Sequence, residues 1–198
     1  STAAASSGFT TGGYCGTYYL YSCTVIGGNY GIRRDINGTV TAKNCYAGGS
    51  ATGDYAGTIT MTTCASEDTT GSAGLQNIAY NTTNFTNVTA GTEDYHLPSG
   101  SVLINVGTDT SGDAAPMNFT NDIDGQTRSG TWDIGADEYV TPITVSLTAN
   151  PAGPLTALGA TNLSWTTTGN PTSCDASNYW SGIDIHNGDP VTQRSGMT

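Results

Sequence analysis

A short pattern that recurs about every twenty residues constrains the fold of this chain more than any other feature. Each repeat is an alternating stretch followed by one small polar residue and then by cysteine or phenylalanine. The four repeats are residues 18–23 (YYLYSC), 40–45 (VTAKNC), 59–64 (ITMTTC) and 80–85 (YNTTNF). Their last residues are spaced by 45 − 23 = 22, 64 − 45 = 19 and 85 − 64 = 21 positions. Such a period is typical of solenoid coils, which bury their apolar faces by stacking.

The order of residues within a repeat predicts which side chains point inward. Strand alternation places Val40 and Ala42 inside and turns Thr41 and Lys43 toward water. The small polar residues are expected at corners, where the backbone adopts a left-handed conformation: Ser22, Asn44, Thr63 and Asn84. One internal ladder, with neighbours about 4.8 Å apart, is then predicted for Cys23, Cys45, Cys64 and Phe85. The alternative is a chance alignment in a β-sandwich rich in threonine and glycine.

The composition narrows the class of protein and its surroundings. The 27 glycines and the many threonines and asparagines disfavour long helices. A net charge of −11 with only five Lys and Arg residues repels phosphate, so we expect no nucleic-acid partner. No apolar run is long enough to suggest membrane insertion. The acidic, lysine-poor balance is typical of exported proteins, so we expect a secreted or cell-surface location.

The cysteines leave two chemical states open. The chain has five, an odd number, and no Cys-x-x-Cys pair, so a zinc site of the usual spacing is not expected. Adjacent coils would bring Cα atoms within disulfide range, and export favours oxidation. Buried free thiols are the alternative within the predicted ladder.

Two motifs near the end of the repeat region carry a family resemblance. The first is residues 95–108 (YHLPSGSVLINVGT), and the second pairs residues 122–128 (DIDGQTR) with residues 132–139 (WDIGADEY). They resemble the closing coil and the terminal signature of bacterial right-handed parallel β-helix repeat proteins of the exported, surface-associated kind. The resemblance implies a fold and a surface location more than a function.

A second resemblance follows the short linker Thr141-Pro142. The matching residues are 145–151 (VSLTANP), 163–165 (LSW), 172–174 (TSC) and 179–182 (YWSG). They resemble a bacterial Ig-like module of surface proteins, in which a later strand normally supplies a second cysteine. Cys174 has no such successor in this sequence. The resemblance therefore implies a partial Ig-like segment.

These observations together predict an all-β chain. Residues 1–140 are expected to form a right-handed parallel β-helix, a solenoid closed by a terminal capping loop. Residues 93–107 would add one more coil to it. Residues 141–198 are expected to form a partial Ig-like β-sandwich segment.

An acidic cluster in the second motif, made up of Asp122, Asp124, Asp133, Asp137 and Glu138, is a candidate metal site. Oxygen donors around an Asp-x-Asp-Gly turn suit calcium, and the predicted ligands are Asp122, Asp124 and Asp133. The ligand spacing of an EF-hand is incomplete. The alternative is a plain turn at Asp124-Gly125, with Arg128 paired to a nearby carboxylate. No cofactor other than calcium is expected.

Catalysis is not expected, because the groups that it requires do not cluster. A lyase needs basic residues near the abstracted proton, and a hydrolase needs two positioned carboxyl groups. The repeat region offers scattered charges instead: Arg33, Arg34, Asp35, Lys43, Asp54, Glu67 and Asp68. His96 and His186 have no Ser or Cys motif beside them and are expected to be ordinary surface histidines.

Several tyrosines could serve either of two purposes. A stripe of aromatic faces would stack on sugar rings, whereas packing between coils would use the same residues for stability. The residues concerned are Tyr14, Tyr18, Tyr19, Tyr21, Tyr30, Tyr46, Tyr55 and Tyr80.

The expected function is that of an extracellular structural or adhesive surface protein. Unpaired strands at the edge of the coils and an incomplete sandwich would let copies self-associate as a fibre subunit through strand completion between neighbours. A carbohydrate-binding or polysaccharide-lyase-like β-helix module, with a surface polysaccharide as partner, is the alternative.

Overall fold

The structure is a computed structural model that describes residues 7–13, 15–150, 162–168, 180–181 and 191–193. The chain divides into two compact units, Ser1–Tyr139 and Val140–Thr198. Throughout the described ranges every helix or strand assigned is a β-strand, which confirms the all-β prediction. No helix in those ranges has the length and apolar character needed to cross a membrane.

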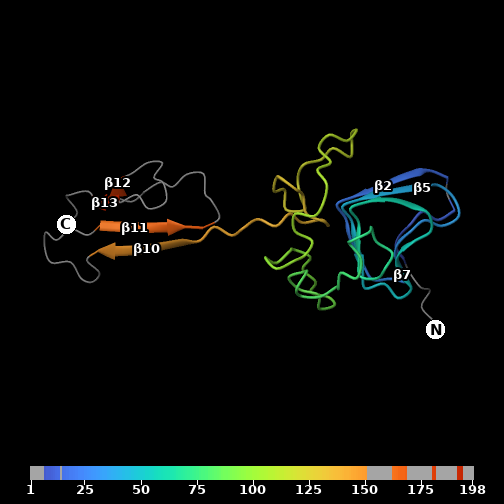
Figure 1. Cartoon of the computed structure of the whole chain (residues 1–198), viewed down its shortest axis with the longest axis horizontal. Helices are drawn as coiled ribbons and strands as arrows, with labels where there is room; N and C mark the ends of the chain where they lie inside the picture. The colour runs from blue at the N-terminus through green and yellow to red at the C-terminus, as the bar shows by residue number, and fades with distance from the viewer. Residues whose placement is uncertain (1–6, 14, 151–161, 169–179, 182–190, 194–198) are drawn as a thin grey trace. The chain divides into compact units, whose positions relative to one another are not determined.

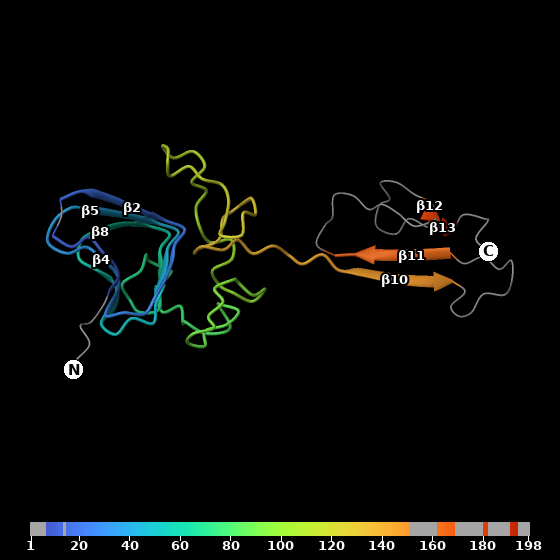
Figure 2. The same cartoon turned by 180° about the vertical axis from the view of Figure 1, so that it is seen from behind.

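Nine strands of the first unit form three stacked coils, drawn from blue to cyan in Figures 1 and 2. The first coil contains β1 (Ser7–Thr10), β2 (Thr17–Tyr21) and β3 (Thr24–Ile26). The second contains β4 (Tyr30–Arg33), β5 (Thr39–Lys43) and β6 (Tyr46–Gly48). The third contains β7 (Gly53–Ala56), β8 (Ile59–Thr62) and β9 (Ala65–Ser66). Each coil gives one strand to each of three sheets, ordered β1-β4-β7, β2-β5-β8 and β3-β6-β9.

All pairs within these three sheets are parallel, as predicted from the repeats. Thr17 pairs with Thr39 and Val40 pairs with Ile59, which are offsets of 39 − 17 = 22 and 59 − 40 = 19 residues. These offsets equal the spacings between the cysteines of the first three repeats. The sequence repeat and the structural coil are therefore the same unit in this region.

The corners between sheets have the left-handed backbone that the sequence predicts. Ser22, Asn44 and Thr63 have φ values of 49°, 51° and 49°. Such a conformation is unusual for a β-branched residue. Thr63 is held in it by its hydroxyl, which donates to Asn44 Oδ1 at 2.5 Å. The fourth expected corner, Asn84, is not among the residues with positive φ.

Inward-facing side chains of the three coils form the first core cluster. Its fully buried members include Val40 and Ala42, while Thr41 and Lys43 are partly exposed, as alternation requires. Cys45 and Cys64 are also fully buried there, and Cys23 packs against them. Four cysteines are present as free thiols: Cys15, Cys23, Cys45 and Cys64. Of the two cysteine states left open, the structure therefore has the reduced one at these positions.

A second core cluster lies on the outer side of the β3-β6-β9 sheet. Tyr46 follows Cys45 in the chain, so its side chain points to the opposite face of the strand. There it packs among residues that come after the coils: Phe85, Leu97, Leu103 and Ile134. The middle strand is consequently covered on both faces, and every residue of β6 is buried. We call residues 67–139, which cover this face, the cap.

Phe85 is not part of the cysteine column. It belongs to the second cluster, where its ring meets the Tyr46 ring edge-on at a centroid distance of 4.8 Å. The reason is local: the Asn81 carbonyl accepts hydrogen bonds from the backbone N–H groups of Asn84 and Phe85, which makes a turn instead of a strand. Edge-to-face aromatic pairs contribute about 0.5–1.5 kcal/mol beyond their buried area. Phe85 thus fastens the cap to the outside of the coils.

The segment 93–107, expected to be one more coil, also consists of turns. Its β contact is an isolated antiparallel bridge between Asn87 and Asp94. Serine and proline shape the next turn, in which Ser101 N–H donates to Pro98 O at 2.9 Å. Across the described residues, the strands of the parallel sheets end at Ser66, so the coils occupy less of the chain than the resemblance implied.

The first part of the cap closes the exposed edge of the third coil. Strand β7 donates from the backbone N–H of Tyr55 to Thr70 Oγ1 at 2.9 Å. Strand β9 donates from Ser66 N–H to Leu75 O at 2.9 Å, and Cys64 N–H donates to Ser72 Oγ at 3.0 Å. These contacts occupy donors that would otherwise attract a further strand.

Asn44 joins the coils to the later part of the cap. Its side chain is fully buried and makes a reciprocal pair with Thr108: Nδ2 donates to Thr108 O at 2.7 Å, and Oδ1 accepts from Thr108 N–H at 2.8 Å. The Asn44 carbonyl accepts from Gly135 N–H at 2.8 Å. Gly135 has φ +105°, and a Cβ there would lie 2.7 Å from Thr24 Oγ1, so this position requires glycine.

The second unit contains one antiparallel sheet of four strands in the order β10-β11-β13-β12. The strands are β10 (Val145–Asn150), β11 (Asn162–Thr167), β12 (Trp180–Ser181) and β13 (Val191–Gln193). Val145 pairs with Thr167 and Asn150 with Asn162. Cys174 and His186 lie outside the described residues.

Replacing Asn44 with alanine should destabilise the first unit by about 2–4 kcal/mol, because Thr108 loses both buried hydrogen bonds and alanine disfavours positive φ. Urea denaturation followed by tyrosine fluorescence measures the change. Asn37→Ala removes an exposed asparagine and should change stability by less than about 0.5 kcal/mol. Equal effects of the two substitutions would contradict the role assigned to Asn44.

Candidate functional site

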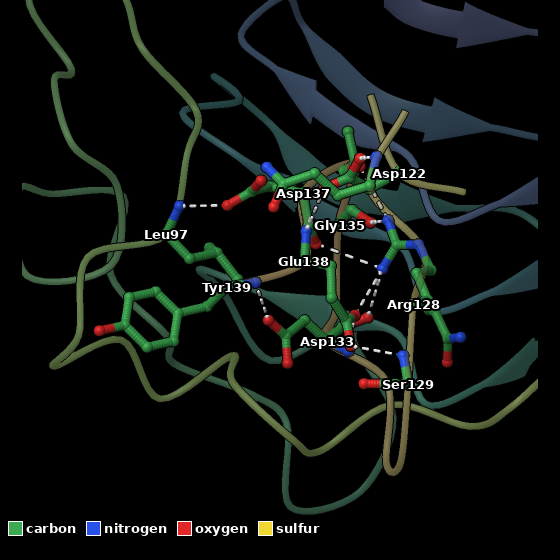
Figure 3. A network of polar contacts seen from close by, with 12 residues as sticks. Leu97, Asp122, Arg128, Ser129, Asp133, Gly135, Asp137, Glu138 and Tyr139 are labelled. Carbon is green, nitrogen blue, oxygen red and sulfur yellow. Dashed lines mark hydrogen bonds and ion pairs between the residues drawn. The ribbon is translucent and has the colours of Figure 1, made fainter. Parts of the chain in front are cut away.

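The cap ends in a buried polar network centred on one arginine (Figure 3). Arg128 is 4% exposed, and its guanidinium donates to Glu138 Oε2 at 3.1 Å. The same group donates to the backbone carbonyls of Gly135, Ala136 and Asp137 at 3.0, 2.8 and 3.2 Å. A planar group with five donors suits several acceptors that converge from one turn. Arg128 therefore fixes the backbone path of residues 132–139.

The carboxylates around this arginine serve as acceptors for backbone N–H groups. Asp133 accepts from Asn105 at 2.7 Å and from Tyr139 at 2.6 Å, with one oxygen each. Asp137 accepts from Leu97 at 2.7 Å. Glu138 accepts from Asp133 N–H at 2.9 Å and from Ser129 N–H at 3.3 Å. Three acidic side chains thus tie distant turns of the cap together, as Figure 3 shows.

Burial of these acids has an electrostatic cost. Removal from water raises the pKa values of Asp133, Asp137 and Glu138, although the backbone donors act in the opposite direction. The ion pair between Arg128 and Glu138, whose side chains are 1% and 8% exposed, offsets part of that cost.

The three predicted calcium ligands lie in the cap but face different partners. Asp122 Oδ1 accepts from the N–H groups of Asp124 and Gln126 at 3.0 and 2.7 Å, and both oxygens of Asp133 accept from the backbone. Asp124 Oδ2 lies 2.8 Å from His96 Nε2. The alternative features are present: Gly125 N–H closes a turn on Asp122 O at 3.2 Å, and Arg128 pairs with Glu138. Calcium binding stays a prediction.

A different set of potential ligands does converge. One ligand atom each from His96, Asp124 and Asp137 lies within 4.8 Å of the other two. His96 and Asp137 line a cavity of about 470 Å³, together with Glu93, Asp94 and Ile123. Hydrogen bonding to Asp94 raises the pKa of His96, against the effect of desolvation.

Sequence reasoning placed Asp124 and Asp137 in one acidic cluster but missed His96, because it lies far from both in the chain. Asp124 is 124 − 96 = 28 residues from His96, and Asp137 is 137 − 96 = 41 residues away. Only turns in the cap bring them together. The one local signal in the sequence is the Asp94-x-His96 spacing. It allows the carboxylate of Asp94 to contact the imidazole of His96.

A second concave site lies between β2 and the loop at residues 115–119. It has a volume of about 720 Å³, and its lining includes Tyr19, Tyr21, Met117 and Phe119. Tyr19 is 52% exposed and packs edge-on with Tyr21 at 6.4 Å. We call this site the aromatic cleft.

Most other tyrosines of the proposed stripe have packing roles. Tyr46 and Tyr55 are buried in the two core clusters. Tyr18 and Tyr80 pack against those clusters, and Tyr14 lies outside the described residues. Among the described residues, the aromatic cleft is thus a place where neighbouring tyrosines of the stripe line a cavity.

The charges considered for catalysis are distributed among local contacts. Arg33 pairs with Asp35 at 3.1 Å, and Lys43 pairs with Asp113 at 2.5 Å. Asp54 and Asp68 each accept from the other's backbone N–H, at 2.9 and 3.0 Å. The Lys43 contact matters to the aromatic cleft because it ties the loop that carries Met117 to the β2-β5-β8 sheet.

Comparison with protein-family models, curated proteins and solved structures found no match to this chain.

Replacing Arg128 with alanine should destabilise the first unit by about 3–5 kcal/mol, because a buried carboxylate loses its counter-charge. Arg33→Ala removes the exposed Arg33–Asp35 pair and should cost no more than about 1 kcal/mol. Urea denaturation of both variants measures the difference. A small effect at Arg128 would show that the network does not hold the cap.

Proposed function

We propose that the chain is a structural or adhesive element of an extracellular surface protein. The observation that carries this proposal is the cap, in which nearly every buried charge is used to hold backbone. Asp133, Asp137 and Glu138 bind N–H groups, and Arg128 binds carbonyls. Groups engaged in this way stabilise a shape, which supports a structural role.

The stacked coils support the same proposal. Parallel strands with a shared core form a stiff unit in which each coil contacts its neighbours. Within this proposal the coils are those of a right-handed β-helix, and the antiparallel sheet of the second unit belongs to an Ig-like fold. Both architectures suit proteins that project from a surface.

Self-association through strand pairing is part of the proposal. Strand β10 lies at one edge of the sheet formed by the described strands, and its six residues, VSLTAN, include no charge and no proline. Val145 at its start is 63% exposed. Edge strands of this composition pair readily with a strand from another chain.

Immunogold electron microscopy of intact cells that make the protein tests this function. Label should lie outside the cells and follow linear arrays. Ser146→Lys places a charge on β10 and should disperse the arrays without removing the surface label. Thr120→Lys, an exposed change in the cap, should leave them intact. Label confined to the cell interior would overturn the proposal.

The aromatic cleft favours a second candidate function, binding of a polysaccharide. Exposed aromatic faces beside an apolar floor suit sugar rings, whose C–H groups pack on them. The net charge of −11 favours neutral over acidic polymers. Lys43 lies over the Tyr21 ring at 5.3 Å and helps to fix the orientation of that ring.

Tyr19→Ala and Phe119→Ala should each weaken binding to a neutral polysaccharide about tenfold or more, if stacking contributes about 1–3 kcal/mol per ring as it does for bases. A panel of neutral and acidic polysaccharides, read by calorimetry, measures this. Tyr30→Ala changes a tyrosine of strand β4, which is in another sheet, and should have no effect. A panel without binders would discard this candidate.

A further inference from the structure

Three potential metal ligands from three separate segments of the cap converge, and two of them, His96 and Asp137, line one cavity. His96 follows the bridge between Asn87 and Asp94, Asp124 lies in the turn that opens the terminal signature, and Asp137 lies near its end. Their ligand atoms lie within 4.8 Å of one another, a separation that a single ion can span. The set includes the imidazole of His96 and the buried carboxylate of Asp137, so it is not merely a cluster of surface carboxylates.

The histidine is oriented in the way that metal-binding histidines usually are. His96 Nδ1 contacts Asp94 Oδ1, and Asp94 Oδ1 also accepts the His96 backbone N–H at 3.1 Å. A carboxylate at one ring nitrogen fixes the ring and directs the other nitrogen, Nε2, toward the ion. In this structure Nε2 points at Asp124 Oδ2, 2.8 Å away.

The two carboxylates are also held in place. Asp137 is only 5% exposed and uses Oδ2 to accept from Leu97 N–H, which is next to His96 in the chain. The backbone of Asp124 is fixed because its N–H donates to Asp122 Oδ1 at 3.0 Å. Each potential ligand therefore has a second contact that sets its position.

The charge balance around the cavity favours a cation. Glu93, Asp94 and Asp137 line it together with His96, and Asp124 contacts the imidazole. The nearby guanidinium of Arg128 is already engaged by Glu138 and backbone carbonyls. The cavity, about 470 Å³, also leaves room for water molecules to complete the coordination.

We propose that His96, Asp124 and Asp137 form a binding site for one divalent transition-metal ion, with water in the remaining positions. One imidazole and two carboxylates suit zinc, for which three protein ligands and an open position are common. Calcium requires six to eight oxygen ligands, so this set does not suit it. The site adds His96 to two members of the acidic cluster, Asp124 and Asp137, and leaves out the predicted calcium ligands Asp122 and Asp133.

A bound ion would connect segments that the backbone leaves as separate turns. It would tie residues 94–96 to the turn at residues 122–125 and both to the buried end of the signature. The ion therefore stabilises the folded cap by mass action, by an amount that grows with its concentration above the dissociation constant.

Titration calorimetry with zinc chloride tests the site on the 198-residue chain carrying Cys15→Ser, since Cys15 is exposed and a thiol is a group that zinc prefers as a ligand. We expect one zinc ion per chain. His96→Ala and Asp124→Asn change exposed residues and should each weaken binding at least about tenfold. Zinc should raise the melting temperature of the parent protein but not of His96→Ala.

Two matched controls separate this site from general attraction to acidic groups. His186→Ala removes the other histidine of the chain, and Asp109→Asn removes an exposed carboxylate outside the set; both should bind zinc like the parent. Cobalt(II) should give a visible spectrum without a thiolate charge-transfer band. Absence of zinc binding, affinity unchanged by His96→Ala, or a thiolate band would each overturn the proposal.

Discussion

The pairing of one coil on the next depends on corners that turn the backbone without a strand. Ser22, Asn44 and Thr63 have the left-handed backbone at equivalent positions, and Thr63 donates to Asn44 across the coil boundary. If these corners did not repeat, the strands that follow could not stay in parallel register. The Asn44 side chain also makes two hydrogen bonds with the backbone of Thr108 in the cap. One column of small polar side chains thus connects the stacking of coils with the closure of their outer face.

How far the sequence predicts the fold differs between the two halves of the first unit. In the coils, residues such as Val40 and Ala42 reveal their inward direction because alternation and register depend on near neighbours. The corner conformations followed from the same repeat. Phe85 matched the pattern equally well and yet lies on the opposite side of the sheet, since the turn started by Asn81 breaks the strand. A repeat of residue types cannot by itself reveal where the chain stops coiling.

The cap was harder to anticipate because long-range polar contacts determine it. Asp122, Asp124 and Asp133 look alike as oxygen donors in the sequence. In the structure Asp122 and Asp133 bind backbone N–H groups, whereas Asp124 meets His96. Whether a carboxylate keeps an oxygen available for an ion depends on how many backbone N–H groups it binds, and those groups come from turns many residues away. The Arg128–Glu138 pair is of the same kind: its partners are ten positions apart, but its burial depends on the entire cap.

The two ends of the stack of coils differ, because the cap covers the edge of the third coil. On that side the backbone donors of Tyr55, Cys64 and Ser66 are occupied by Thr70, Ser72 and Leu75, so no additional coil can pair there without displacing the cap. Growth or loss of coils by duplication and deletion in evolution is then restricted to the opposite side. The number of coils in such a stack can therefore change on that side while the capped side keeps its contacts.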